Sequence, residues 1–515
     1  MKEIELAPSR PGETIATMLQ RAGASFELPC AGNHTCGKCK IAARGELDPP
    51  SPSEAVVLGA HDMAAGLRMA CFAKATGPVT VLLPERGGGQ ILTDGRGRLE
   101  ARRPMMAEGR HGAAIDIGTT TVVCKIYDAS GDELATVSEL NAQRRFGADV
   151  ISRIDYGIRH GNEDVHASIV GQLEGMLDRA AREAGIDRAS VTHAVATGNT
   201  TMLHFLCGLD PKGIGYVPFT PQSLFGVERE DALRGIHLYV PPCVSAYVGA
   251  DLVCCVLASG MMGRADTALI VDIGTNGEMA LLHRGVLHAC STAAGPAFEG
   301  AGIHSGMTAT AGAISHVRWH DDGLAFDTID DAHAVGICGS GVLDVIAVLL
   351  ERGAIRPSGL LEPLDDGPLA SLIANHEEEG AELTFPGTQV VLKQSDVRQV
   401  QLAKAAIYAG MITLADACAL PMDQIDVLYV CGGFGSFLDL ASAEVIGLIP
   451  RGLGARTVVL GNGAITGAAM LLLDREARTE VEAIASGCRH IELSDSAEFM
   501  DAYVGSMPFG DMDEG

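Results

Sequence analysis

A short turn that occurs twice constrains this chain more than any other feature of its sequence. Asp116-Ile-Gly-Thr follows one apolar run and precedes another, and the same four residue types return at Asp272, 156 residues later. Each copy predicts a buried strand, a tight turn at the glycine, and a second strand. One copy alone would also fit an ordinary hairpin. Two copies at this separation predict two related domains that face each other across a cleft.

Both turns carry groups that suit phosphate and magnesium. Hydroxyls and backbone N–H groups can surround phosphate oxygens, and a carboxylate can hold a hydrated Mg²⁺ ion. We expect Asp116 and Asp272 to hold that ion from opposite sides of the cleft. Glu278 and Glu299 are candidates for orienting the attacking water. The other expected nucleotide ligands in the turns are Gly118, Thr119, Thr120, Thr121, Gly274, Thr275 and Asn276.

Two later glycine-rich segments complete the expected nucleotide site. The first leads into an expected helix whose N–H groups would face a phosphate; it contains Gly339, Ser340 and Gly341. The second follows an expected strand at 427–430 and leaves room for an adenine or a ribose against the backbone; it contains Gly432, Gly433, Gly435 and Ser436. Between them, Ser395 is expected to cap a long helix.

Four N-terminal cysteines predict a metal centre of another kind. Cys30, Cys36, Cys39 and Cys71 have the spacing C-x5-C-x2-C-x31-C. Thiolates in a loop of small residues, with the last ligand from a distant segment, favour a 2Fe–2S cluster. A structural zinc site is the alternative, although such sites usually pair two C-x2-C knuckles. The arrangement resembles that of plant and adrenodoxin-type ferredoxins. His34 lies inside the loop and is expected to be a bystander.

The motifs and the composition of the linker predict four parts: a cluster domain at 1–84, a linker at 85–110, and two nucleotide-binding subdomains, the expected ATPase half, at 111–264 and 265–515. The linker is rich in glycine and arginine and is expected to be a solvated tether. Its basic residues would also suit docking on an acidic surface, including that of the ATPase half. The formal charge is −27, and residues 1–110 sum to +2, which leaves −29 for the remainder. That acidic body argues against a nucleic-acid partner.

The cysteines and the apolar runs indicate a cytoplasmic location. The chain has 14 cysteines and no signal-peptide pattern at its start, so reduced thiols are expected. The most apolar run, 244–262, contains Asp251 and is not expected to span a membrane. Cysteines outside the N-terminal set, including the adjacent pair Cys254 and Cys255, are interpreted as small apolar packing groups.

The order and spacing of the two turns and the late glycine loop resemble the acetate and sugar kinase, Hsp70 and actin superfamily. This resemblance implies an α/β chain with a duplicated ribonuclease-H-like ATPase core. The core would follow an N-terminal β-grasp ferredoxin-like domain.

Taken whole, the chain resembles the reductive activators of corrinoid-dependent methyltransferases. In that family, ATP and an iron–sulfur domain return an oxidised Co(II) corrinoid to Co(I). The resemblance implies a 2Fe–2S cluster, ATP and Mg²⁺ as cofactors, a corrinoid protein and a low-potential electron donor as partners, and a homodimer. The chain differs from larger members because only about 26 residues separate the cluster domain from the ATPase core, whereas those members have a longer linker and an extra middle domain.

Three other functions remain open at this point. One is an ATP-dependent activator of a radical dehydratase or an aryl-CoA reductase. Another is a small-molecule kinase regulated by a redox cluster. The third, a chaperone-like ATPase, does not account for the four N-terminal cysteines.

Overall fold

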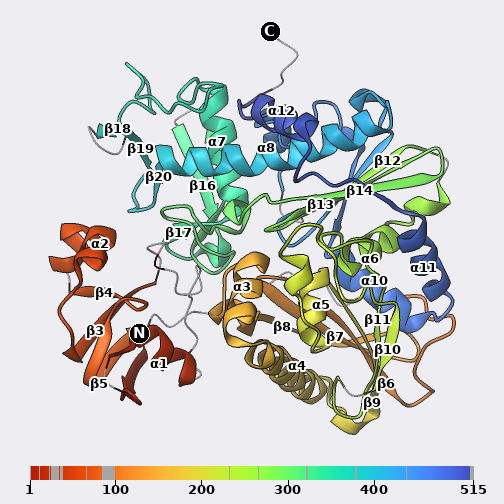
Figure 1. The fold of residues 1–515 in the computed structure, drawn as a ribbon. Helices are drawn as coiled ribbons and strands as arrows, with labels where there is room; N and C mark the ends of the chain where they lie inside the picture. The colour runs from red at the N-terminus through yellow and green to blue at the C-terminus, as the bar shows by residue number, and fades with distance from the viewer. Residues whose placement is uncertain are drawn as a thin grey trace.

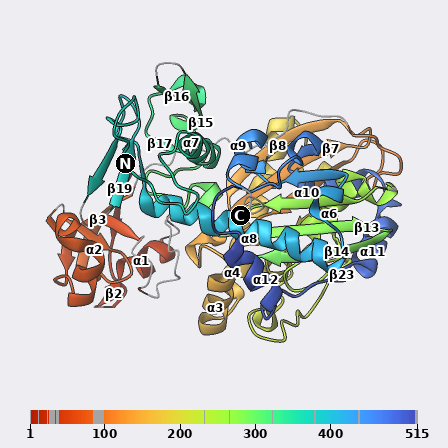
Figure 2. The same cartoon turned by 90° about the horizontal axis from the view of Figure 1, so that it is seen from above.

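The computed structural model describes residues 2–10, 12–22, 24, 34, 39–64, 66–83, 99–230, 232–264, 266–320, 323–376, 380–435 and 438–510. Residues 2–83 form a small unit beside the larger body of the chain, and both views of the ribbon separate the two (Figures 1 and 2). The larger body contains two six-stranded sheets, one in each of its halves. We call residues 111–264 the first half and residues 266–510 the second half.

The N-terminal unit is a sheet with two helices and its own apolar core. Its strands lie in the order β1-β5-β3-β4, with β2 also paired to β5. Buried Ile15, Met18 and Leu19 of the first helix belong to that core. A buried ion pair between Arg68 and Glu54, with Nε and Oε1 2.9 Å apart, joins the second helix to β4. The elements are β1 (Lys2–Leu6), β2 (Glu13–Thr14), α1 (Ile15–Arg21), β3 (Lys40–Leu47), α2 (Pro52–Ala64), β4 (Leu67–Met69) and β5 (Lys74–Leu83).

The sheet of the first half has the strand order β10-β11-β9-β6-β7-β8. Its consecutive strands β6, β7 and β8 pair antiparallel, whereas β6, β9 and β11 pair parallel. The strands are β6 (His111–Ile117), β7 (Thr121–Asp128), β8 (Glu133–Leu140), β9 (Val191–Gly198), β10 (Val227–Arg229) and β11 (His237–Val240). The helices are α3 (Val150–His160), α4 (Glu163–Ala184), α5 (Thr200–Leu206) and α6 (Ala250–Ser259).

The second half repeats this arrangement. Its sheet has the order β22-β21-β12-β13-β14-β23, in which β12, β13 and β14 pair antiparallel and β12, β21 and β22 pair parallel. The strands are β12 (Ala268–Ile273), β13 (Gly277–His283), β14 (Val286–Thr292), β21 (Val427–Cys431), β22 (Thr457–Gly461) and β23 (Arg489–His490). The same sequence of pairings in both halves confirms the predicted duplication.

Insertions between β14 and β21 enlarge the second half. They form two three-stranded sheets, of which the first is β15 (Ala313–His320), β16 (Gly323–Thr328) and β17 (Gly336–Ile337). The second is β18 (Ile373–His376), β19 (Gly380–Thr384) and β20 (Val391–Lys393). The helices of this half are α7 (Gly339–Glu351), α8 (Gln394–Ala417), α9 (Leu440–Val445), α10 (Gly463–Leu473), α11 (Ala477–Gly487) and α12 (Ala497–Gly505).

Helices α6 and α10 join the halves by packing closely against each other (Figure 1). A Cβ atom placed on Gly467 of α10 would lie 2.2 Å from the backbone oxygen of Cys254 in α6. Only glycine permits this approach, because any larger residue would collide with the backbone of the partner helix. The first residues of both helices are consequently held near the middle of the molecule.

Two local expectations from the sequence are wrong. Ser395 does not cap the long helix: α8 already begins at Gln394, and the Asp396 carboxylate accepts from the N–H of Lys393 at 2.9 Å. Residues 99–106 of the linker are not a solvated tether. The N–H of Met105 donates to Leu472 O at 2.9 Å, and the Met105 and Met106 side chains are buried. This segment instead docks on the ATPase half, as the basic alternative proposed.

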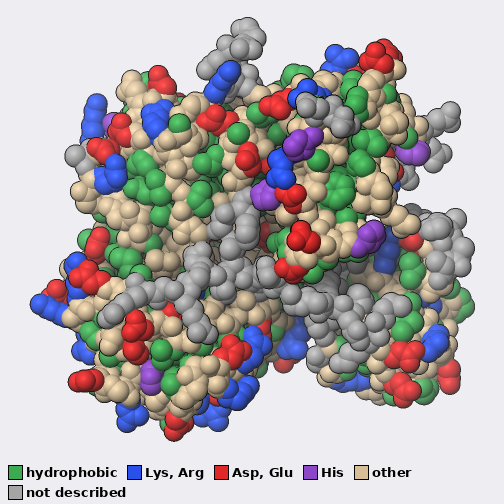
Figure 3. Space-filling model, turned by 180° about the vertical axis from the view of Figure 1, so that it is seen from behind, with side chains coloured by type: hydrophobic (Ala, Val, Ile, Leu, Met, Phe, Trp, Pro, Cys, Tyr) green, Lys and Arg blue, Asp and Glu red, His purple; other side chains and the backbone are tan. Residues whose placement is uncertain are grey.

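The surface seen from behind carries acidic and basic side chains interspersed, with no continuous strip of either sign (Figure 3). Among the described helices, none is both long enough and apolar enough to cross a membrane.

Candidate functional site

The two repeated turns meet between the halves. The first joins β6 to β7 and the second joins β12 to β13. The Oγ1 atoms of Thr120 and Thr275 are 3.4 Å apart. The Glu299 carboxylate accepts from both hydroxyls, at 2.6 Å each. The structure therefore brings the predicted phosphate-binding turns together, one from each half.

Three side chains that the sequence did not single out fix the first turn. Asn141 Nδ2 donates to Gly118 O at 2.8 Å, and Asn199 Nδ2 donates to Thr119 Oγ1 at 3.1 Å. The Arg153 guanidinium donates to Thr119 O at 2.5 Å and to Gly147 O at 3.0 Å. Arg153 is fully buried, and that burial lowers its pKa to about 9. The turn is thus held rigidly in place before any ligand binds.

Asp116 faces a helix that belongs to the other half. Asn462 Nδ2, at the start of α10, donates to Asp116 Oδ2 at 2.8 Å. The Asn462 side chain also caps that helix by accepting from Ile465 N at 2.9 Å. Burial raises the pKa of Asp116 to about 7, and the charge of Asp272 adds to the increase. Protonation of this carboxyl is therefore possible near neutral pH.

Asp272 is the counterpart of Asp116 in the second turn. The Cys255 thiol of α6 contacts Asp272 Oδ2 at 3.5 Å, and burial raises the pKa of Asp272 to about 6. Gly432 has φ +96°, and a Cβ atom there would lie 2.6 Å from Asp272 Oδ1 and 2.5 Å from Ile273 O. The expected adenosine loop therefore packs directly against the second turn, at a position that requires glycine.

Two more carboxyl groups lie beside Asp272. Asp251 is in the first turn of α6, and burial together with the Asp272 charge raises its pKa to about 8. Glu278 is buried and forms a hydrogen bond with Asp251; burial and the neighbouring carboxylates hold its pKa well above the ordinary range. Its Oε1 atom has no hydrogen-bond partner among the described residues. At least one proton or cation is needed to balance this group of acids.

This chemistry fits a divalent cation. Buried carboxylates with raised pKa values and an unpartnered buried oxygen are what a cation would stabilise. In the described parts of the chain, no three His, Cys, Asp or Glu side chains are arranged to bind a metal ion directly. An ion held through water, as expected for Mg²⁺, matches this arrangement better than a closed protein cage.

The other predicted nucleotide ligands differ in how far they are buried by neighbouring residues. Gly339 to Gly341 begin α7, where a Cβ atom on Gly339 would lie 1.8 Å from Phe298 O and Ser340 Oγ donates to Ser315 O at 2.7 Å. These residues are buried in packing, and their contact with a nucleotide stays a prediction. Gly433 borders open space, Gly435 packs on Val430, and Ser436 lies outside the described residues.

Sequence reasoning missed Asp251, Asn462 and Cys255. Asp251 was noted only because it interrupts an apolar run, and a lone acid in such a run was the available signal. Cys255 was interpreted as packing, yet its sulfur contacts Asp272. Asn462 lies 346 residues from Asp116 in the sequence. No local pattern could have paired the two.

The N-terminal cysteines are partly described. Cys39 Sγ and Cys71 Sγ are 3.3 Å apart and buried. Two sulfurs on one tetrahedral metal, each bonded at about 2.3 Å, would lie roughly 3.8 Å apart. This pair therefore fits two ligands of a single iron, and equally of a zinc ion. Cys30 and Cys36 lie outside the described residues, and the His34 ring packs 4.1 Å from the Phe72 ring.

Two family models match adjacent parts of the chain. A family model described as the C-terminal domain of RACo, the ASKHA domain, matches residues 266–514, and one described as the RACo middle region matches residues 111–264. The expectation that this chain lacks a middle region is therefore wrong. The fold of the larger body is that of the actin, sugar kinase and Hsp70 group, as the duplicated turns predicted.

Individual relatives point the same way. The chain is 35% identical over 425 residues to the corrinoid activation enzyme RamQ of Eubacterium limosum, across 78% of this chain and 70% of the relative. It is 26% identical to a Co(II) methylated amine-specific corrinoid protein reductase of Methanosarcina barkeri, across 76% of each. A solved reductive activator for corrinoid, iron–sulfur protein matches with a TM-score of 0.71 and 28% identity, covering 96% of this chain and 95% of that one. The chain belongs to the family of reductive activators of corrinoid proteins.

Proposed function

We propose that this chain binds MgATP between its halves and uses it to drive the reduction of a partner's Co(II) corrinoid to Co(I). Asp116 and Asp272 would hold the hydrated Mg²⁺ ion from opposite sides. Thr120 and Thr275 would donate to phosphate oxygens, and the Gly432 loop would receive the adenosine. The support is geometric: both turns meet at 3.4 Å between their hydroxyls, and Gly432 lies against Asp272.

The electron would come from the N-terminal unit. Cys30, Cys36, Cys39 and Cys71 would hold a 2Fe–2S cluster, which supplies one electron at a time when bound. One observation carries this half of the proposal: the Cys39 and Cys71 sulfurs, from segments 32 residues apart, lie 3.3 Å from each other in a buried position. An external low-potential donor would then refill the site, and we assign a ferredoxin-like character to residues 1–84 on this basis.

ATP would assist by favouring one state of the complex over another. A nucleotide can shift an equilibrium only by binding its two states with different affinities. We therefore assign to the ATP-bound form a tighter hold on the corrinoid protein in the geometry from which reduction is favourable. By reciprocity, binding of the corrinoid protein should raise the affinity of this chain for ATP by the same factor.

The proposal is tested with the full chain, a chemical low-potential donor, ATP and a corrinoid protein trapped as Co(II). Formation of Co(I) is followed by its visible absorption. We expect reduction that requires ATP, and ATP hydrolysis that rises when the Co(II) protein is added. Cys36→Ser should stop the reduction while leaving ATP binding intact.

A second measurement tests the cluster by itself. The purified chain should contain two irons and two acid-labile sulfides, and Cys71→Ala should abolish the visible spectrum. One zinc per chain without labile sulfide would refute the cluster. Phosphorylation of a sugar or a carboxylic acid, with cobalt left as Co(II), would favour a kinase instead.

A further inference from the structure

Glu299 ties the two phosphate turns together across the cleft. Its Oε2 atom accepts from Thr120 of the first half, and its Oε1 atom accepts from Thr275 of the second half, each at 2.6 Å. One carboxylate thus uses one oxygen for each half. The two hydroxyls are 3.4 Å apart, so the carboxylate serves both of them at once.

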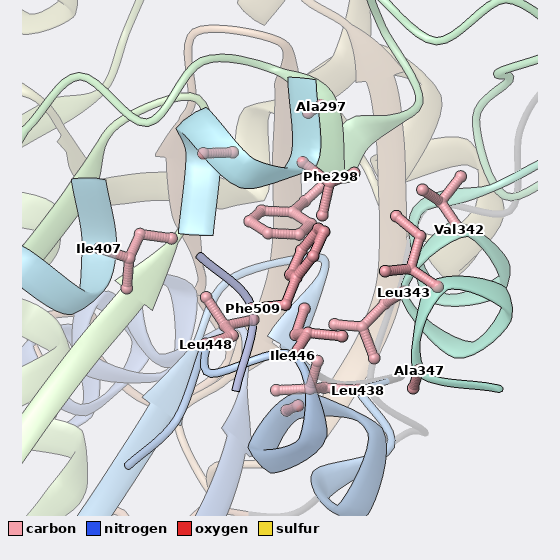
Figure 4. Close-up of a cluster of buried hydrophobic side chains, with 14 of the residues drawn as sticks. Ala297, Phe298, Val342, Leu343, Ala347, Ile407, Leu438, Ile446, Leu448 and Phe509 are labelled. Atoms are coloured by element: carbon pink, nitrogen blue, oxygen red, sulfur yellow. The ribbon is translucent and has the colours of Figure 1, made fainter. Parts of the chain in front are cut away.

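The turn that carries Glu299 is anchored in the core of the second half. Ala297 and Phe298 of this short turn are buried, and the Phe298 ring stacks on Phe434 at 4.8 Å between centroids. Figure 4 shows Ala297 and Phe298 among the apolar side chains that surround them, including Leu343. Packing therefore holds the backbone that carries Glu299, while its side chain keeps its own rotatable bonds.

The chain on either side of Glu299 is also fixed. Gly300, directly after Glu299, has φ +77°, and a Cβ atom there would lie 2.4 Å from Met307 O. Before it, Gly295 N donates to Thr275 O at 2.9 Å, which attaches the loop to the second turn itself. Both flanks restrict the movement of the carboxylate relative to Thr275.

The hydroxyls that Glu299 occupies are those that a terminal phosphate requires. A nucleotide whose adenosine lies on the Gly432 loop extends from the second half toward the first. Its outermost phosphate is then the group that reaches Thr120. Carboxylate and phosphate oxygens accept the same hydrogen bonds, and their like charges repel each other at this separation. The two anions therefore compete for one pair of donors.

We propose that Glu299 is a displaceable anion in the position of the γ-phosphate, which ATP must displace and ADP leaves in place. The bridge between the halves is then made by Glu299 in the empty and ADP-bound forms and by the γ-phosphate in the ATP-bound form. The anion that bridges the two halves thereby depends on whether the terminal phosphate is present. This inference rests on the proposed ATP site.

The test compares nucleotide affinities of the full chain by calorimetry, with ATP in the presence of Mg²⁺ and with ADP. Glu299→Gln keeps the size of the side chain and removes its charge. We expect the affinity for ATP to rise by at least about fivefold, the lower end of typical coupling between interacting ligands. The affinity for ADP should change by much less.

Thr120→Val and Thr275→Val provide matched controls, because they break the same contact from the other side. Both remove donors that the phosphate needs, so the affinity for ATP should fall in these variants. An ATP affinity that rises in Glu299→Gln and falls in the threonine variants distinguishes competition from a purely structural role of the hydrogen bond. If Glu299→Gln does not fold, Glu299→Asp is used; its shorter side chain cannot serve both hydroxyls but keeps the negative charge, so a smaller increase in the affinity for ATP is expected.

Two results would overturn the inference, and a third would refute the ATP site itself. Equal affinities of the variant and wild-type chain for ATP would overturn the inference. A loss of turnover of about 100-fold at unchanged ATP affinity would also overturn it, because that is the effect of removing a general base. Failure of the wild-type chain to bind ATP at all would instead refute the nucleotide site on which the inference rests.

Discussion

The two halves of the ATPase body share a backbone plan and differ in what surrounds their key carboxylate. In each half, a parallel strand pair and an antiparallel hairpin place an aspartate at the end of the first strand. Each aspartate then meets a helix from the other half: Asp116 at the start of α10 and Asp272 in the middle of α6. Asp116 receives an amide donor from Asn462, whereas Asp272 receives a thiol from Cys255. Duplication therefore preserved the positions and not the chemistry.

The difference concentrates negative charge on one side of the cleft. Asp251 and Glu278 both lie beside Asp272, and burial raises their pKa values. Asp116 instead accepts a hydrogen bond from the neutral amide of Asn462. A cation at this site should therefore depend more on the second half. In the proposed site, the first half would contribute the hydroxyl and amide groups that position the phosphates.

The largest expected effect follows from this asymmetry. Asp272→Asn should reduce the rate of ATP hydrolysis by about 100-fold and Asp116→Asn by at least about tenfold, since each removes charge stabilisation at the reacting phosphate. Steady-state phosphate release under saturating Mg²⁺ is the measurement. Equal losses in both variants would show that the halves share the cation evenly. Wild-type rates in both would refute the site.

The sequence predicted the parts of this site that are local. Both turns, the strands that flank them and the duplication follow from apolar runs around Asp-Ile-Gly-Thr, because these depend on neighbouring residues. The sequence did not predict the side chain that contacts each aspartate. Asn462 and Cys255 reach their carboxylates only because α6 and α10 cross at Gly467, and helix crossing is a tertiary property.

The structure contradicts two smaller expectations from the sequence, the helix cap at Ser395 and the tether at residues 99–106. Ser395 has the residue type preferred for a helix cap, but the helix extends past it because Asp396 accepts the N–H of Lys393. Residues 99–106 have the composition of a tether, yet their backbone hydrogen-bonds to the end of α10. For residues 99–106 a contact outside the local window decided the conformation, whereas the Asp396–Lys393 hydrogen bond is local.

A second prediction concerns pH and the acids of the second half. The pKa of Asp251 is raised to about 8, from an ordinary value near 3.8. Its contribution to stability is therefore complete below about pH 4 and is lost as the pH rises through 8. Asp251→Asn should be more stable than the wild-type chain at pH 8 without Mg²⁺, and this advantage should shrink toward pH 5.

Thermal unfolding of both proteins between pH 5 and 8.5 measures this difference, at roughly 1 °C for each kcal/mol in a body of about 400 residues. Adding Mg²⁺ should reduce the advantage of the variant at pH 8, because the ion neutralises the same charges. A difference in Tm that is constant across the pH range would refute the role of Asp251.

The third prediction tests the first half. Asn462→Ala removes the cap of α10 and the amide donor to Asp116. We expect a loss of about 1 kcal/mol of stability from the cap, or roughly 1 °C in Tm. Asn462→Ser is the control, because its hydroxyl can still cap the helix but is too short to donate to Asp116. That variant should recover the Tm and not the rate of ATP hydrolysis.

The smallest expected effect separates packing from hydrogen bonding at Cys255. A hydroxyl can replace the thiol as a donor to Asp272, whereas a methyl group cannot, so Cys255→Ser should hydrolyse ATP faster than Cys255→Ala. Cys124, buried in the sheet of the first half, is the control. There the serine variant should be the less stable of the two, since a buried hydroxyl without a partner costs about 1–3 kcal/mol. If Cys255 follows the order of Cys124 in both rate and Tm, its thiol only fills space, and the second turn has no donor that corresponds to Asn462.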